Sequence, residues 1–232
     1  MVIEDPDERS KLPDGKSWGA HVRRGSLTLR GFGDGNSLSL TSAEVTWNNS
    51  KVELLKSNLA AGGRGMELSE LVWFNGAMCT VDDRTGVVYK ISEAGAVPWV
   101  ILGDGDGTRL KGLKGEWMAV RGSDLWVGGL GKEWTTRDGE LASYDPMWVK
   151  VIGPNGQVEH VNWRKQFLAV RAAAGVEWPG YMIHEAVAWS ESSSRWVFLP
   201  RRLGRHKYDD VTDERRGTNL MITADPNFED IR

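Results

Sequence analysis

Short apolar runs separated by turn residues fill most of this sequence and constrain its fold more than any other feature. They are rich in Val, Leu, Thr and Trp, as in "GSLTLRGF" (25–32), "SLSLTSAEVTW" (37–47), "GVVYKI" (86–91), "MWVKVIGPNGQVEHV" (147–161) and "HEAVAWSESSSRWVFL" (184–199). Groups such as "DRTG", "GPNG" and "SESSS" interrupt them, as is typical between short strands. The 28 glycines and 12 tryptophans suit tight turns and aromatic residues packed between sheets. The pattern predicts an all-β fold.

Two local signals add detail to this prediction. Asn-Gly pairs in "WFNGAM" and "GPNGQV" favour hairpin turns, because Asn and Gly tolerate the positive φ values that such turns need. One helix interrupts the strands: in "NWRKQFLAVRAAAG", Asn162 is a candidate N-cap and Gly175 a candidate end. Its apolar side chains are spaced to form one face, with Trp163, Phe167, Val170 and Ala174.

A repeat runs through the strand pattern. "SELVWFNGAMCTVDD" starts at Ser69, "EWMAVRGSDLWVGG" at Glu116 and "EAVAWSESSSRWVFLPR" at Glu185. Each copy has a polar first residue, an apolar strand, a polar turn and a second apolar strand. The starts lie 47 residues apart (69 to 116) and 69 residues apart (116 to 185), and the helical insertion explains the longer step. Such a spacing is expected for the blades of a β-propeller, although an up-and-down sandwich remains an alternative.

The bulk composition excludes several classes of protein. The 232 residues suffice for a single domain with a sizeable core, which we take to span residues 1–232. Acidic residues (32) slightly outnumber basic ones (29), so no basic surface for nucleic acid is indicated. The apolar runs are too short for a membrane span, and the acidic opening "MVIEDPDERS" does not resemble a signal peptide. A single cysteine, Cys79, excludes an internal disulfide and a multi-cysteine metal site.

The segment "VILGDGDGTRLKG" (100–112) invites three interpretations. As an EF-hand loop starting at Asp104 it fails, because Arg109 stands where the loop needs Gly and Gly115 where it needs Glu. Its glycines have the wrong spacing for a dinucleotide-binding loop, and a P-loop Lys-Ser/Thr pair is absent. Local rules therefore predict only a turn.

Longer motifs resemble a known family. "GRGMELSELVWFNG" (63–76), "VDDRTGVVYKI" (81–91), "VPWVILGDGDGT" (97–108), "GGLGKEWTT" (128–136), "LAVRAAAGVEWPGYMIHEAVAWS" (168–190) and "RWVFLPRR" (195–202) occur together and in order. They resemble the calcium-activated nucleotidase, or apyrase, family, which includes salivary apyrases of blood-feeding arthropods and a vertebrate enzyme of the endoplasmic reticulum and Golgi. The resemblance runs from about residue 2 to residue 231. It implies hydrolysis of nucleoside di- and triphosphates of the UDP, GDP and ADP class.

The resemblance also implies a five-bladed β-propeller with Ca²⁺ on its axis. In this family each blade directs one oxygen-bearing residue towards the ion, and the matching positions here are Ser69, Glu116 and Glu185. These are also the three starts of the repeat. Calcium takes six to eight oxygen ligands in loose geometry, which a ring of blades can supply from several sides. The sequence leaves open whether backbone or side-chain oxygens bind.

Phosphate hydrolysis needs a positioned water, a proton acceptor and positive charge on the phosphoryl oxygens. Through the resemblance we assign Asp7 and Asp83 as carboxylates that orient the water or accept its proton. Arg201 is assigned to the phosphate, because a guanidinium can bind two phosphate oxygens at once. Further substrate contacts are expected from neighbouring motif residues, which are Asp5, Asp82, Arg84, Asp104, Asp106, Lys132, Glu133 and Trp134.

Three expectations concern residues around these motifs. Trp134 is suited to stack on a base, although core packing is nearly as good an interpretation for it. His184 is interpreted as a structural group, not as a catalytic base. The charged run "YDDVTDERRGTN" (208–219) is expected to form an exposed hairpin end.

The chain is shorter than the family pattern at both ends. By the repeat spacing, family members continue for roughly another blade and a half, so about three and a half blades are expected here. Such a gap exposes the edges of two blades, which predicts either an unstable, non-catalytic chain or one completed by another chain, for example as a homodimer. The family implies a place in the secretory pathway, extracellular or in the lumen of the endoplasmic reticulum or Golgi.

Overall fold

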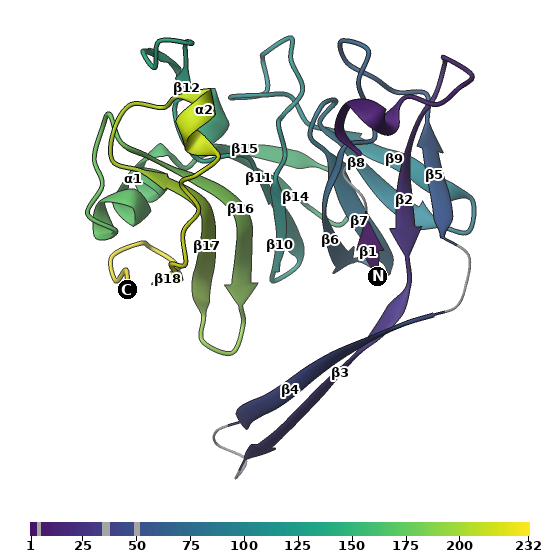
Figure 1. Ribbon diagram of the computed structural model, residues 1–232, viewed down its shortest axis with the longest axis horizontal. Coiled ribbons are helices and arrows are strands. Elements are labelled where there is room, and N and C mark those ends of the chain that lie inside the picture. The colour runs from purple at the N-terminus through teal and green to yellow at the C-terminus, as the bar shows by residue number, and fades with distance from the viewer. Residues whose placement is uncertain (4–5, 34–37, 49–51) are drawn as a thin grey trace.

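The computed structural model describes residues 1–3, 6–33, 38–48 and 52–232, with the backbone alone for residues 7–8, 32–33 and 38–40. It is mostly β-structure, and the strands pair antiparallel throughout the described part (Figure 1). This confirms the all-β prediction. The strands are β1 (Val2–Ile3), β2 (Trp18–Arg23), β3 (Gly25–Gly33), β4 (Leu38–Trp47), β5 (Glu53–Ser57), β6 (Leu68–Phe74), β7 (Ala77–Asp82), β8 (Val87–Ser92), β9 (Gly95–Ile101), β10 (Trp117–Arg121), β11 (Asp124–Gly128), β12 (Trp134–Thr135), β13 (Leu141–Ser143), β14 (Trp148–Ile152), β15 (Val158–Asn162), β16 (Tyr181–Ser190), β17 (Arg195–Gly204) and β18 (Ile222–Ala224).

The helices of the described part are short. Two are α-helices, α1 (Arg164–Ala173) and α2 (Asp210–Asp213), and two are 3₁₀ turns, η1 (Asp7–Ser10) and η2 (Asp145–Met147). None of them is long and apolar enough to cross a membrane.

The strands form a row of sheets that follow the order of the chain. Among the described residues these sheets have the strand orders β1-β2-β5, β6-β7-β8-β9, β10-β11-β14-β15 and β16-β17-β18. The first strands of the last three sheets are neighbours, because β10 contacts both β6 and β16 (Figure 1). The hairpins of the predicted repeat are therefore real: they are β6-β7, β10-β11 and β16-β17.

The hydrophobic core lies between neighbouring sheets. Strand β10 shows why, since Trp117 and Ala119 pack towards the β16-β17-β18 sheet and Met118, between them, packs towards the β6–β9 sheet. Alternate side chains of a strand point to opposite faces, so one strand joins two cores. A third cluster fills the space between β2, β5 and β6–β8.

Tryptophans gather in one of these layers, as the composition suggested. The rings of Trp163 and Trp196 meet at 88° with their centroids 4.9 Å apart, and Trp126 lies 5.3 Å from Trp196. Edge-to-face contacts of this kind stabilise aromatic pairs beyond the burial of their surface.

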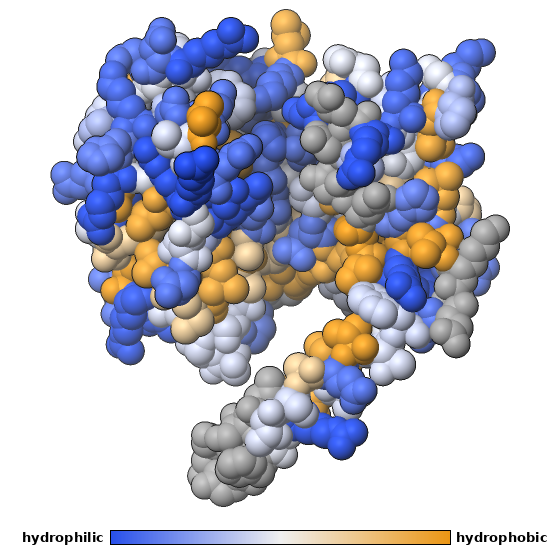
Figure 2. Space-filling view, in the orientation of Figure 1, coloured by the Kyte–Doolittle hydropathy of each residue, from blue (hydrophilic) through white to orange (hydrophobic). Residues whose placement is uncertain are grey.

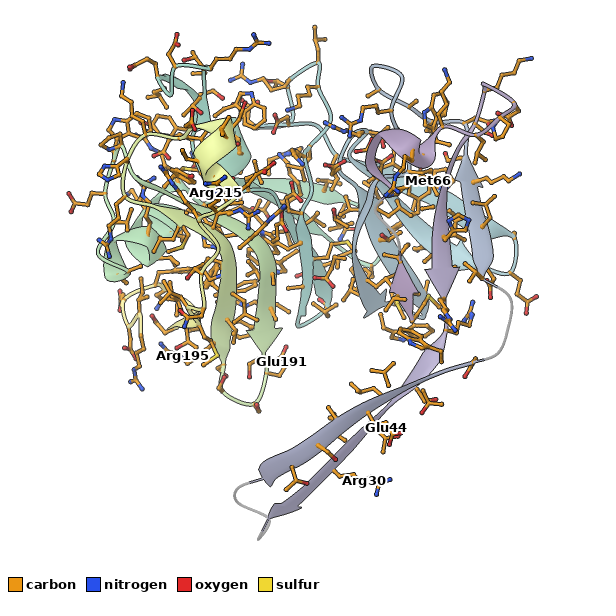
Figure 3. All side chains as sticks on the ribbon, in the orientation of Figure 1. Arg30, Glu44, Met66, Glu191, Arg195 and Arg215 are labelled. Atoms are coloured by element: carbon orange, nitrogen blue, oxygen red, sulfur yellow. The ribbon has the colours of Figure 1, made fainter. Side chains whose placement is uncertain are left out.

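A two-stranded ribbon, β3-β4, projects away from the sheets (Figure 1). Its polar face carries Arg30 and Glu44, both labelled in Figure 3. Its other face exposes Leu27, Leu29 and Val45. The sequence pattern predicted β3 and β4 but missed β2 and β5, which pair with each other at the base of the ribbon.

The predicted helix and one predicted turn are confirmed with small corrections. Helix α1 buries Phe167 and Val170 and ends before Gly175, which has φ +69°. It starts at Arg164, not directly after Asn162, although the Asn162 side chain does accept a hydrogen bond from the Arg164 N–H. Asn75 and Gly76 both have positive φ, as a tight hairpin requires. In "GPNGQV" only the glycine does, so that hairpin closes with a longer loop.

The packing of α1 generates a stability prediction. Phe167 is 1% exposed and contacts the rings of Trp163 and His184. We expect Phe167→Ala to lower the free energy of unfolding by about 3–5 kcal/mol, because it leaves a cavity under the helix. Urea denaturation followed by tryptophan fluorescence measures this. The exposed Lys165→Ala on the same helix is the control and should stay within about 0.5 kcal/mol of the parent. Equal losses for both variants would contradict this packing.

Candidate functional site

A cavity of about 520 Å³ opens where β10, β16 and β17 meet the loop around β12, and residues of the α2 segment form part of its wall. The surface around α2 is predominantly hydrophilic (Figure 2). The lining holds both signs of charge, with basic residues Lys114, Lys132, Arg137, Arg201 and Arg202 and acidic residues Glu116, Glu185, Asp210, Asp213 and Glu214. Five sequence-predicted site residues are therefore brought together in one wall: Glu116, Lys132, Trp134, Glu185 and Arg201.

The predicted calcium ligands belong to the three neighbouring first strands. Glu116 immediately precedes β10, Glu185 lies in β16 and Ser69 lies in β6. Strand register shifts just after Ser69 and around Glu185, so both positions sit at β-bulges. Bulges re-aim side chains and are common beside functional sites. Glu116 is buried, and burial raises its pKa to about 7, while Lys114 acts in the opposite direction and Glu185 adds repulsion.

Lys114 joins two of the predicted site carboxylates. Its Nζ donates to Asp83 Oδ2 at 2.5 Å and to Glu116 Oε1 at 2.6 Å. Both carboxylate side chains are 8% exposed, so this ammonium group neutralises charges that water barely reaches. Burial acts to lower the pKa of Lys114, but Glu116 and Asp83 outweigh it and the pKa is raised. The second oxygen of Asp83, Oδ1, is buried and accepts no hydrogen bond from the described residues.

Arg201 pairs with Glu185 in the same way. Its Nη1 donates to Glu185 Oε1, and half of the Arg201 side chain remains exposed in the cavity. The next residue, Arg202, also lines the cavity, and its Nε lies 3.8 Å from Asp213 Oδ2. A guanidinium that already holds one carboxylate keeps further N–H donors for another anion.

Lys132 is enclosed by aromatic rings. Its Nζ lies 4.1 Å from the centroid of Tyr208 and 6.0 Å from that of Trp134, and it donates to the backbone oxygen of Glu133. Burial lowers the pKa of Lys132 to about 8. Trp134 itself is 39% exposed at the cavity, so it is a wall residue and not a core residue.

Glu133 points the other way, into the protein. Its Oε2 accepts a hydrogen bond of 2.8 Å from Arg171 of α1, and both side chains are almost fully buried. The helical insertion thus reaches the loop that carries Lys132 and Trp134. Glu133 does not line the cavity.

Asp82 and Arg84 lie beside the cavity and not in it. Asp82 accepts hydrogen bonds from the Met66 N–H, the Arg84 N–H and the Thr85 hydroxyl, so it closes a buried turn. Arg84 donates to Glu67 at 3.0 Å, and Arg64 pairs with the same carboxylate. Asp82 and Arg84 thus hold the backbone on either side of Asp83 in place.

The loop with Asp104 and Asp106 folds mainly onto itself. Asp104 accepts from the Gly105 N–H and Asp106 from Thr108, which are turn interactions. Neither residue lines the cavity. The loop still reaches its edge, since Lys111 Nζ lies 4.4 Å from the ring centroid of Trp134. Local rules, which predicted only a turn, describe Asp104 and Asp106 well.

The side chains of two predicted site residues are not described by the structure. Asp5 lies outside the described residues, and of Asp7 only the backbone is described, in η1. Among the side chains that are described, no group of three or more His, Cys, Asp and Glu could hold a metal ion. The donors that are present still fit calcium in kind: Glu116 and Glu185 are hard oxygen ligands, and each is held by a cation that lines the cavity.

Comparison with known proteins decides the family. The sequence matches the apyrase family over residues 6–232. The chain belongs to this family. Among its relatives, rat soluble calcium-activated nucleotidase 1 is 50% identical over 230 residues, which are 99% of this chain and 55% of that protein. Apyrase apy-1 of Caenorhabditis elegans is 47% identical over 99% of this chain and 62% of its own length. The apyrase of Cimex lectularius is 42% identical over 98% and 61%. This apyrase-family chain thus spans little more than half of these relatives.

Sequence reasoning missed several residues of the apyrase-family cavity. The run at 208–219 is not a hairpin end: α2 and the chain before it place Tyr208, Asp210 and Asp213 in the cavity wall. Lys114, which lines the cavity, was missed as well, although it stands only two residues before Glu116. The interpretation of His184 as structural agrees with its complete burial between the rings of Phe167 and Phe198.

The Glu133–Arg171 pair generates the second prediction. We expect Arg171→Met to lower the free energy of unfolding by about 3–5 kcal/mol, because it leaves the Glu133 carboxylate buried without a partner. The double variant Arg171→Met/Glu133→Gln should recover part of that loss. Urea denaturation of the single and double variants measures the coupling. The exposed Lys165→Met on the same helix is the control. If Arg171→Met were as stable as this control, the pair would not be holding the loop.

Proposed function

We propose that this chain hydrolyses nucleoside di- and triphosphates of the UDP, GDP and ADP class in a calcium-dependent reaction that releases inorganic phosphate. The observation that carries the proposal is the pairing of Glu116 with Lys114 and of Glu185 with Arg201 in one cavity. The two carboxylates are suitable ligands for a divalent metal ion. The side chains of Lys114 and Arg201 are positively charged and suit the phosphates of a nucleotide. Membership in the apyrase family supports the same assignment.

The fold we propose is that of a β-propeller with five blades in its complete form. In support, the sheets follow one another in chain order, and their first strands β6, β10 and β16 lie next to one another. Radial repetition of small antiparallel sheets around inner strands is the principle of this architecture. Residues 1–232 would supply part of the ring, and a homodimer is a further element of the proposal.

Ser69, Glu116 and Glu185 are the residues we propose to hold Ca²⁺. They come from adjacent inner strands, and two of them lie at bulges. When bound, calcium supplies positive charge to phosphoryl oxygens. Calcium would also neutralise part of the negative charge of three closely spaced acidic side chains, which are Asp83, Glu116 and Glu185.

The chemistry of the chain's own residues follows from their positions. Arg201 is placed to bind phosphate oxygens, because its guanidinium is half exposed and already oriented by Glu185. Lys132 adds a second positive group at the same wall. Asp83, which Lys114 links to the cavity, is proposed to orient the attacking water or to accept its proton; its Oδ1 oxygen is buried, accepts no hydrogen bond from the described residues and lies 3.7 Å from Arg84 Nε. We assign the same task to Asp7 on the family resemblance alone.

The nucleobase would meet the aromatic side of the cavity. Trp134 and Tyr208 line it, and Trp134 is exposed enough for a base to stack on its ring. Asp5, Asp82, Arg84, Asp104, Asp106 and Glu133 remain proposed contacts, and those with described side chains would act through the segments they hold in place. A place in the secretory pathway, outside the cell or in a lumen, completes the proposal.

The third prediction tests this function directly. We expect the purified chain to release phosphate from UDP, GDP or ADP with calcium, and to stop when a chelator is added. Arg201→Ala should lower kcat/KM by about 10²–10³-fold, because it removes charge stabilisation of the transferred phosphoryl group. Arg215→Ala is the control, since Arg215 is exposed beside α2 (labelled in Figure 3) but does not line the cavity. Release that persists with the chelator, or no release at all, would overturn the proposal.

A further inference from the structure

The position of Lys114 is unusual for a lysine, because its charged end lies between two buried carboxylates. Its ammonium group lies between Asp83 Oδ2 and Glu116 Oε1, at 2.5 and 2.6 Å, and its own side chain is only 28% exposed. A lysine usually buries part of its flexible methylene stem and keeps its ammonium group in water. Here it lies against two almost completely buried carboxylates, and it also lines the cavity.

The carboxylates require a cation at this point. Glu116 and Asp83 are both buried, and Glu185 adds a third negative charge that Glu116 senses. Removing charges from water is costly unless an opposite charge compensates them at close range. Lys114 meets that requirement in the chain as it stands, and Arg201 does so for Glu185.

The backbone around Lys114 is packed closely against its neighbours. A Cβ on Gly115 would come within 2.7 Å of Val81, and a Cβ on Gly129 within 2.5 Å of the Lys114 carbonyl oxygen. Both contacts show the chain packed against its neighbours without spare room. The four-carbon stem of lysine, by contrast, has several rotatable bonds and reaches either the carboxylates or the open cavity.

We propose that Lys114 is a tethered counter-ion of Glu116 which Ca²⁺ displaces, so that its ammonium group is released to the phosphates of the substrate. This inference rests on the proposed function and deepens it. With calcium bound, Glu116 turns its charge to the ion, while Lys114 keeps Asp83 as its single partner and faces the cavity. Lys114 is thus a substrate-binding residue whose ammonium group becomes available to the nucleotide when calcium binds.

Two consequences follow for binding. Calcium must compete with an internal cation, so the affinity for calcium is lower than the carboxylates alone would give. Because coupling between two ligands is reciprocal, a nucleotide that draws Lys114 into the cavity strengthens calcium binding to the same extent. Calcium displaces Lys114 from Glu116, and the nucleotide attracts it into the cavity, so each ligand favours the binding of the other.

Direct calcium binding tests this inference without relying on activity. Isothermal titration calorimetry would compare the calcium affinity of the parent chain with that of Lys114→Met. The variant keeps the unbranched stem and loses the charge. We expect its Kd for calcium to fall by roughly tenfold, the effect of removing one charge-assisted hydrogen bond to the ligand. Lys165→Met, which removes an exposed lysine elsewhere, should leave the Kd unchanged. An equal or higher Kd in folded Lys114→Met would overturn the inference.

A second measurement uses the unaltered chain, in case Lys114→Met fails to fold. Reductive methylation with formaldehyde modifies lysine amines that the reagent can reach, and mass spectrometry identifies each modified site. Calcium should raise the modification of Lys114 several-fold, because its amine leaves Glu116 and turns towards the open cavity. Modification of Lys165 should not change. Equal labelling of Lys114 with and without calcium would refute the exchange.

The outcomes separate this inference from the function on which it rests. If the parent chain binds no calcium even at millimolar concentration, the proposed function fails and the exchange fails with it. If the parent binds calcium while Lys114→Met shows no gain and Lys114 labelling is unchanged, the exchange alone is wrong.

Discussion

The burial of negative charge beside strands β7, β10 and β16 is the constraint on which the rest of this site depends. Glu116 and Asp83 lie where water scarcely reaches, and Glu185 is close enough to repel Glu116. A fold can hold such a group only if cations are positioned with it. Lys114 and Arg201 supply them, and both open onto the cavity. The same two side chains therefore compensate the buried carboxylates in the folded chain and present positive charge to a ligand in the cavity.

The sheets make this arrangement possible because they share their cores. Strand β10 buries side chains on both of its faces, so it cannot shift against either neighbouring sheet without opening a void. Glu116 stands at the start of that strand. The bulges in β6 and β16 then adjust the direction of single residues on a rigid frame. A cavity wall built in this way keeps its geometry while long side chains such as Lys114 move.

The sequence predicted those parts of the structure that depend on neighbours along the chain. The repeat identified Glu116 and Glu185, the pattern identified most strands, and the helix at 164–173 was found within two residues. Strands β2 (WGAHVR) and β5 (ELLKS) were missed because small and charged residues interrupt their apolar pattern, and they pair with each other across 31 to 39 residues of sequence. Lys114 was missed for a similar reason, since its partner Asp83 comes from a different sheet. Charge pairs between sheets leave no periodic trace in a sequence.

The same reasoning changes the meaning of the helical insertion. In the sequence, α1 interrupts a series of strands; in the structure, its Arg171 pairs with Glu133 and so holds the loop of Lys132 and Trp134. Glu67 is likewise paired with Arg64 and Arg84, next to Asp83. Among the described side chains, the buried carboxylates of Glu67, Glu116 and Glu133 are thus each paired with at least one Lys or Arg side chain. Because a single unpaired member would be strongly unfavourable, the cavity forms only when all of these segments are in place.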